Sequence, residues 1–258
     1  MDLELFRSVV EQVAPITELV CFHLMGDPLV HPQFKEMVEI CDDHQVKIFL
    51  VTNGVLVRPE KFELLLHPNF HQINFSLHSF FDNFPDKDPY NYLERIFAFT
   101  ERALEERPDL YLNFRLWNLN DPLGSQTPNT QMLDSICERF DVNAPSNIDV
   151  RKRKSVNIKE RLYLHFDTEF IWPSLDLPVL GMTGTCYGLK SHFGVLADGT
   201  VVPCCLDKEA AIPLGKVQDA PIVDILASRR AQDILKGFKH KKLLEGLCQR
   251  CQYIERFS

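Results

Sequence analysis

The sequence has no continuous apolar run of about 18 residues, and no basic segment opens it. These absences argue against a membrane span and a secretory signal peptide, and we expect a cytoplasmic protein. Positive charge is scarce as well, since 28 Lys and Arg face 36 Asp and Glu and the formal net charge is −8. Proteins that bind nucleic acid or anionic lipid through charge need the opposite balance, so we expect neither partner.

Several common catalytic and phosphate-binding motifs are also missing. The chain has no Walker loop, no Gly-x-Gly-x-x-Gly fingerprint and no Ser-His-Asp order, and it contains no internal repeat or low-complexity tract. What remains is an ordinary globular composition with 45% hydrophobic residues. At 258 residues the chain is long enough for one large domain or two small ones.

Strand and helix patterns alternate over the first two thirds of the chain. Short apolar runs are separated by segments whose apolar residues recur every three or four positions. The expected strands cover 19–24, 46–51, 71–77, 110–117 and 161–166, and the expected helices cover 1–13, 33–44, 59–66, 90–106 and 129–140. This alternation predicts an α/β fold with a parallel sheet that forms a partial TIM-like (β/α) barrel. Because a helix comes first, we expect its partner strand to be missing from this chain.

The pattern changes near residue 167, where we expect a domain boundary. Prolines and glycines become frequent, residues 192–203 predict a β-hairpin turning at Asp198-Gly199, and 221–238 predicts a helix. The predicted domains are therefore a partial barrel over 1–166 and a smaller domain over 167–258.

Five of the eight cysteines fall in this second domain, and four of them could surround one metal centre: Cys186, Cys204, Cys248 and Cys251. The last two form a C-x-x-C pair. In a reducing compartment, clustered cysteines are more often metal ligands than disulfides. Four thiolates select zinc or an iron–sulfur cluster, and the spacing alone does not separate the two. The isolated Cys21 and Cys41 are expected to lie in the core.

Polar groups follow the first four expected strands. They are Gly26, Asp27 and Pro28 after the first strand, Thr52 and Asn53 after the second, Ser76 on the third and Arg115 on the fourth. Parallel α/β folds place their sites at the carboxyl ends of the strands. A carboxylate can hold an ammonium, a guanidinium a carboxylate, and a hydroxyl or amide a sugar hydroxyl. The set suits a zwitterionic amino acid that carries a ribose.

These motifs resemble those of the radical S-adenosylmethionine (SAM) superfamily. Residues 24–32 read Leu-Met-Gly-Asp-Pro-Leu-Val-His-Pro, followed by Thr52-Asn53-Gly54 and Ser76-Leu77-His78. In that family a Gly-Glu-Pro motif ends the second barrel strand, and its carboxylate and nearby backbone bind the methionine amino group. The resemblance covers roughly residues 1–166. It implies that the polar set binds SAM, with the shorter acid Asp27 at the amino group, Ser76 near the ribose and Arg115 near the methionine carboxylate.

The C-terminal part resembles the SPASM or shorter "twitch" extension of the same superfamily. That extension has a cysteine, a hairpin with Asp-Gly before Pro-Cys, a helix and a closing C-x-x-C. The resemblance implies one auxiliary [4Fe–4S] cluster on Cys186, Cys204, Cys248 and Cys251. Cys205 is an alternative to Cys204 as ligand, and a structural zinc ion is the alternative to the cluster.

The family's C-x-x-x-C-x-x-C, which holds the cluster that cleaves SAM, does not occur in the sequence. We expect that the chain starts inside the family's domain, and that as it stands it does not generate the 5′-deoxyadenosyl radical. For the intact parent, the resemblance implies an oxidoreductase that abstracts hydrogen from a peptide, sugar or other small substrate. Its electrons would come from a reductant such as a flavodoxin or ferredoxin.

The alternative function is a non-catalytic binding or scaffold module with a structural four-cysteine zinc or iron–sulfur site. The missing motif favours this alternative, whereas the set of SAM-binding groups disfavours it. The sequence therefore leaves open whether this chain is itself an enzyme.

Overall fold

The computed structural model describes residues 1–119, 129–143, 149–152 and 154–257. The chain divides into two compact units. We call Glu18–Phe170 the sheet unit, and Met1–Thr17 together with Ile171–Ser258 the hairpin unit. Within the described ranges, no helix has both the length and the apolar character needed to cross a membrane.

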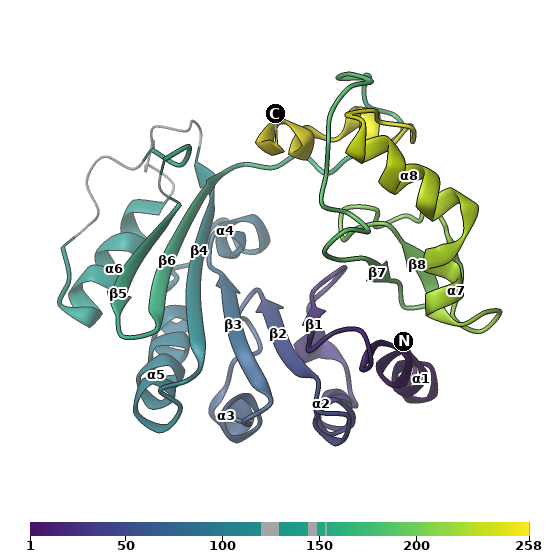
Figure 1. The fold of residues 1–258 in the computed structure, drawn as a ribbon. Coiled ribbons are helices and arrows are strands. Elements are labelled where there is room, and N and C mark those ends of the chain that lie inside the picture. The colour runs from purple at the N-terminus through teal and green to yellow at the C-terminus, as the bar shows by residue number, and fades with distance from the viewer. Residues whose placement is uncertain (120–128, 144–148, 153, 258) are drawn as a thin grey trace. The chain divides into compact units, whose positions relative to one another are not determined.

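The sheet unit is built on six strands in the order β1-β2-β3-β4-β6-β5 (Figure 1). The strands are β1 (Leu19–Phe22), β2 (Lys47–Thr52), β3 (Phe70–Ser76), β4 (Tyr111–Leu119), β5 (Ser155–Lys159) and β6 (Leu162–Thr168). All neighbouring pairs from β1 to β6 are parallel, and β5 returns antiparallel at the edge. The predicted α/β class with a partial barrel is therefore confirmed.

Helices connect these strands and cover one face of the sheet (Figure 1). They are the 3-10 helix η1 (Pro28–Val30) and the α-helices α2 (Phe34–Asp43), α3 (Pro59–Leu65), α4 (Ser79–Asn83), α5 (Tyr90–Glu106) and α6 (Thr130–Phe140). On the covered face, Phe75 packs against Phe99 of α5, and Phe114 packs against Phe97. Because side chains alternate along a strand, the residue after Phe114, Arg115, points to the opposite face.

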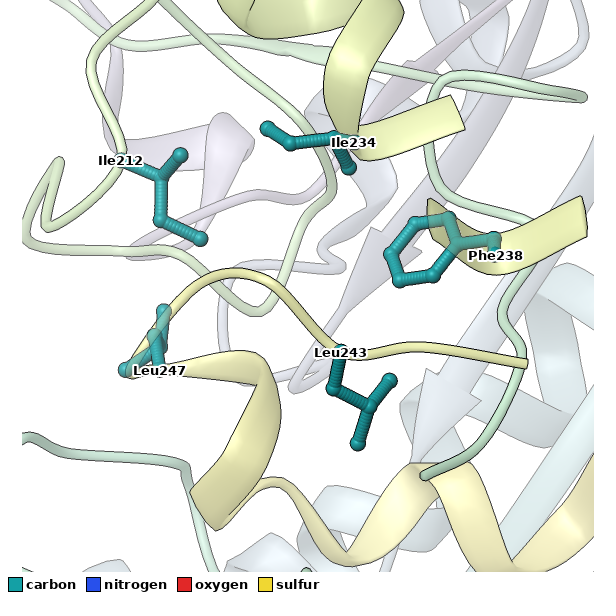
Figure 2. Close-up of a cluster of buried hydrophobic side chains, with 5 residues drawn as sticks. All are labelled: Ile212, Ile234, Phe238, Leu243 and Leu247. Carbon is teal, nitrogen blue, oxygen red and sulfur yellow. The ribbon is translucent and has the colours of Figure 1, made fainter. Parts of the chain in front are cut away.

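The hairpin unit contains α1 (Leu3–Val13) and a three-stranded antiparallel sheet of β7 (Gly194–Val195), β8 (Thr200–Val202) and β9 (Gly215–Lys216). It ends with α7 (Ile222–Ala227), α8 (Arg229–Lys239), η3 (Cys248–Arg250) and η4 (Gln252–Phe257). Figure 2 shows part of its core, formed by Ile212, Ile234, Phe238, Leu243 and Leu247. The helix α1 is tied into this unit by the Gln12 side chain, whose Oε1 accepts from the Ile222 N–H at 2.8 Å.

Two expectations from the sequence are wrong. The single helix expected over 221–238 is two helices, because Ser228 has an extended backbone and its hydroxyl caps α8 by accepting from the Ala231 N–H at 3.4 Å. Serine favours such N-cap positions over helix interiors. Cys21 is exposed rather than buried, since it faces away from its buried neighbour Phe22 on the short strand β1, whereas Cys41 is buried as expected.

Candidate functional site

Asp27 joins the carboxyl ends of β1 and β2. Its Oδ2 accepts from the Thr52 hydroxyl and from the Asn53 N–H, each at 2.7 Å. Its Oδ1 accepts from the Leu29 N–H at 2.9 Å and so caps η1, which has Pro28 at its first position. A carboxylate offers about four acceptor positions. The three hydrogen bonds therefore fix Asp27 in place and leave an acceptor position for a ligand.

The turn after β2 is held from behind by Tyr92 of α5. The chain turns at Gly54 with a φ of 77°, and the Gly54 N–H donates to the Thr52 hydroxyl at 3.0 Å. The Tyr92 hydroxyl donates to the Asn53 carbonyl at 2.7 Å. Burial raises the pKa of Tyr92, and the nearby Asp27 raises it further. Tyr92 therefore remains a neutral hydrogen-bond donor. It fixes the loop whose residues donate hydrogen bonds to Asp27.

We expect Tyr92→Phe to lower the free energy of unfolding by about 1–2 kcal/mol, because the Asn53 carbonyl loses its buried donor. Urea unfolding measures this loss. The matched control is Tyr90→Phe, since Tyr90 is 62% exposed in the first turn of the same helix. Its effect is expected to stay within about 0.5 kcal/mol. Equal losses in the two variants would contradict a role for the Tyr92 hydroxyl.

Arg115 lies on β4, in register with Ser76 of β3. Its guanidinium is 4.3 Å from the centre of the Trp117 ring and 5.9 Å from that of Phe49. With the amide oxygen of Asn74 turned toward it, Arg115 Nε donates to that oxygen at 3.2 Å. Burial lowers the pKa of Arg115 to about 10. No carboxylate of the described residues pairs with this half-buried cation, and a partly desolvated charge in that situation favours an anionic ligand.

The structure thus gathers the predicted polar set at one edge of the sheet. Asp27, Thr52 and Asn53 are in direct contact, and Ser76 and Arg115 follow on the next two strands. Tyr92 and Asn74, which support the set, did not stand out in the sequence. Their spacing indicated only a helix face and a strand, and no local motif marks their partners.

The predicted cysteine ligands lie close enough to one another to interact electrostatically. Burial raises the pKa of Cys204 to about 12, and Cys205 and Cys186 add to the shift. Burial also raises the pKa of Cys248, and the neighbouring thiols of Cys204, Cys186 and Cys251 raise it further. A group of partly buried thiols of this kind becomes a set of thiolates when a cationic metal centre compensates their charge.

One backbone N–H group donates to a sulfur atom of this set. The Gly188 N–H donates to Cys186 Sγ at 3.4 Å. The N–H groups of Asp207 and Ile254 donate to the carbonyl oxygens of Cys204 and Cys251, at 3.3 and 3.4 Å, and so fix the backbone that carries these two thiols. Hydrogen bonds to sulfur, such as that from Gly188, stabilise thiolates and tune the potential of iron–sulfur clusters.

The cysteine side chains do not converge on a single point. Among the residues with described side chains, no three His, Cys, Asp or Glu are grouped so that they could hold a metal ion. A single zinc ion requires four thiolates at about 2.3 Å from one centre. A four-iron cluster is larger, so its ligands stand farther apart. The partly buried thiols, with the Gly188 N–H donating to Cys186, fit a cluster, and Cys205 belongs to the same group because it interacts with Cys186 and Cys251.

Comparisons with solved structures bear on the fold. BtrN in complex with AdoMet and 2-DOIA is 14% identical with a TM-score of 0.60, and the match covers 98% of this chain and 80% of BtrN. Native anSMEcpe with bound AdoMet is 16% identical with a TM-score of 0.52, covering 100% and 79%. Streptococcus suis SuiB bound to precursor peptide SuiA is 12% identical with a TM-score of 0.58, covering 98% and 65%.

Comparisons of the sequence itself identify its domains. No curated protein matches the chain. A family model described as the radical SAM superfamily matches residues 1–120, and a model described as an iron–sulfur cluster-binding domain, SPASM, matches residues 186–252. The two descriptions bear out the predicted cofactors, SAM and an iron–sulfur cluster. The chain therefore carries a radical SAM domain over residues 1–120 and a SPASM domain over residues 186–252.

Proposed function

We propose that the sheet unit binds SAM at the carboxyl ends of β1 to β4, and that the protein serves radical chemistry on a peptide or another small substrate. One observation carries this proposal. A fixed carboxylate, Asp27, and a half-buried guanidinium without an acidic partner among the described residues, Arg115, lie at the carboxyl ends of neighbouring strands. The methionine part of SAM carries an ammonium and a carboxylate, which are the complementary charges.

Each residue of the edge has a separate task in this proposal. Asp27, with the backbone of Gly26 and Pro28, receives the ammonium group of SAM. Arg115 receives the carboxylate, and Ser76, on the strand between them, receives a ribose hydroxyl. Thr52 and Asn53 hold the Asp27 carboxylate in position through their hydrogen bonds to it. Cleavage of bound SAM would supply a 5′-deoxyadenosyl radical for hydrogen abstraction, and that cleavage requires a cluster on the C-x-x-x-C-x-x-C motif, which this sequence does not contain.

The hairpin unit holds the auxiliary [4Fe–4S] cluster in this proposal, on Cys186, Cys204, Cys248 and Cys251. The Gly188 N–H, which donates to Cys186 Sγ, supports the thiolate form of that ligand. A peptide is the substrate class that the comparisons support, because the SuiB structure contains a precursor peptide. The reductant is proposed to be a flavodoxin or a ferredoxin.

The test is SAM binding by anaerobic calorimetry to wild-type protein and to Arg115→Met. The variant is expected to bind SAM about tenfold more weakly or worse, because a charge-assisted hydrogen bond is lost. Its free energy of unfolding should change little, because removing a half-buried charge without an acidic partner offsets the loss of the contacts with Trp117 and Asn74. The matched control is Arg58→Met, since Arg58 is exposed. Absence of SAM binding by the wild-type chain, or equal binding by the two variants, would refute the proposal.

A further inference from the structure

A group of lysines stands out on the hairpin unit because the chain is acidic overall, with a net charge of −8. We call Lys190, Lys236, Lys239, Lys241 and Lys242 the lysine surface. Two of them lie in the last turn of α8, and two follow it directly. All five are exposed, and none forms an ion pair with a described carboxylate. The positive charge of this surface is therefore available to a partner.

Backbone hydrogen bonds place the lysine surface beside the first cysteine of the proposed cluster. The Gly184 N–H donates to the Lys241 carbonyl at 3.0 Å, and the Leu243 N–H donates to the Met182 carbonyl at 2.9 Å. The segment after α8 thus runs alongside residues 182–184, which lead directly into Cys186.

A cavity of about 490 Å³ opens at this place. Its lining includes Cys186, Tyr187, Lys190, Leu235, Phe238 and Lys239. Phe238 belongs to the core of the unit (Figure 2). Tyr187 is 48% exposed, and the Lys190 ammonium lies 5.3 Å from the centre of its ring. The cavity therefore combines an apolar floor, an ammonium rim and the sulfur-bearing residue Cys186.

We propose that the lysine surface docks an acidic one-electron carrier protein, which exchanges electrons with the auxiliary cluster next to Cys186. This inference rests on the proposed function, since it requires that cluster. In each encounter one electron leaves the cluster and reduces the oxidised carrier, and no bond is made or broken. Protein interfaces usually have an apolar centre surrounded by a polar rim. The interfaces of electron-transfer complexes bury a comparatively small area.

Charge and position together favour a redox partner over an acidic peptide. Exposed lysines raise the rate of encounter with any acidic molecule. The lysines would attract an acidic peptide equally well, whereas an electron carrier must also come close to a cluster ligand in order to react. The carrier is therefore the occupant that uses every feature of the cavity.

The experiment uses the full chain after anaerobic reconstitution, with its iron content measured first and an oxidised flavodoxin as the probe. Biolayer interferometry gives the affinity, and stopped-flow absorption gives the rate of flavodoxin reduction by the reduced protein. The double variant Lys190→Glu/Lys239→Glu is expected to lower both by about tenfold or more at low salt. Lys35→Glu/Lys159→Glu changes the charge equally on the sheet unit, and its effect should stay below about twofold.

Three results would count against either the docking proposal or the proposed auxiliary cluster. Full iron content with unchanged flavodoxin binding in Lys190→Glu/Lys239→Glu would overturn the docking proposal and leave the cluster intact. Tighter binding of a deca-glutamate peptide than of flavodoxin, lost in the same variant, would overturn it in favour of an acidic peptide. Wild-type protein without iron would instead refute the auxiliary cluster, and with it the electron exchange proposed for this surface.

Discussion

Replacing Cys248 and Cys251 together by alanine is expected to reduce bound iron from about four atoms per chain to nearly none. The two residues supply half of the proposed ligands, and a cluster held by two thiolates is not retained. Anaerobic reconstitution followed by iron and sulfide analysis, with an absorption spectrum, measures this loss. Because Cys248 and Cys251 lie on a short 3-10 turn beside the core of Figure 2, we expect the unit to lose stability as well.

The matched control for this variant removes two cysteines from the sheet unit, Cys21 and Cys137. Neither is near the proposed cluster ligands in sequence, and neither is fully buried. Iron content should be unchanged in Cys21→Ala/Cys137→Ala. Single alanine variants of Cys204 and Cys205 identify which of the two adjacent thiols is the ligand. One tightly held zinc per chain and no iron in the wild-type protein would instead assign a structural zinc site.

Gly54→Ala is expected to lower the free energy of unfolding by about 2–4 kcal/mol. Gly54 has a φ of 77°, a left-handed conformation that disfavours any side chain. An added Cβ would also lie 2.7 Å from Ile96 Cδ1 and 3.1 Å from the Tyr92 hydroxyl. Both residues belong to α5 and are buried, so neither can move aside without opening the core. Urea unfolding of the two proteins measures the difference.

Gly26→Ala separates the two causes of this loss. Gly26 has the same φ of 77°, but an added Cβ there meets no atom within 4 Å. Its loss should therefore reflect backbone conformation alone and stay near about 1–2 kcal/mol. Equal destabilisation by the two substitutions would show that contact with Ile96 and Tyr92 plays no part.

Much of the fold could be predicted because its signals are local. The apolar spacing over residues 90–106 alone marks the helix α5, whose observed bounds are Tyr90–Glu106. The short edge strand β5 was not expected, because Ser155–Lys159 is too brief and too polar to show a strand pattern, and only its pairing with β6 defines it. The break at Ser228 was also missed, since a serine in an amphipathic run does not reveal whether it will cap or continue a helix.

The candidate site likewise contains contacts that local signals predict and contacts that depend on tertiary packing. Asp27, Thr52 and Asn53 could be predicted to lie together because each lies at or shortly after the end of a parallel strand, and the carboxyl ends of such strands meet on one side of the sheet. The contact of Tyr92 with the Asn53 carbonyl spans 39 positions and depends on how α5 settles on the sheet. The aromatic and amide surroundings of Arg115 likewise arise from neighbouring strands in register, which no single segment encodes.

The hydrogen bond between Gln12 and the Ile222 N–H has a consequence for biosynthesis. It links positions that are 210 residues apart in the sequence, one before and one after the whole sheet unit. During translation the sheet unit can fold as soon as its own strands have emerged, whereas α1 must wait for α7 before its partner exists. We therefore expect the hairpin unit to fold last, and metal loading of its cysteines to follow the synthesis of nearly the entire chain.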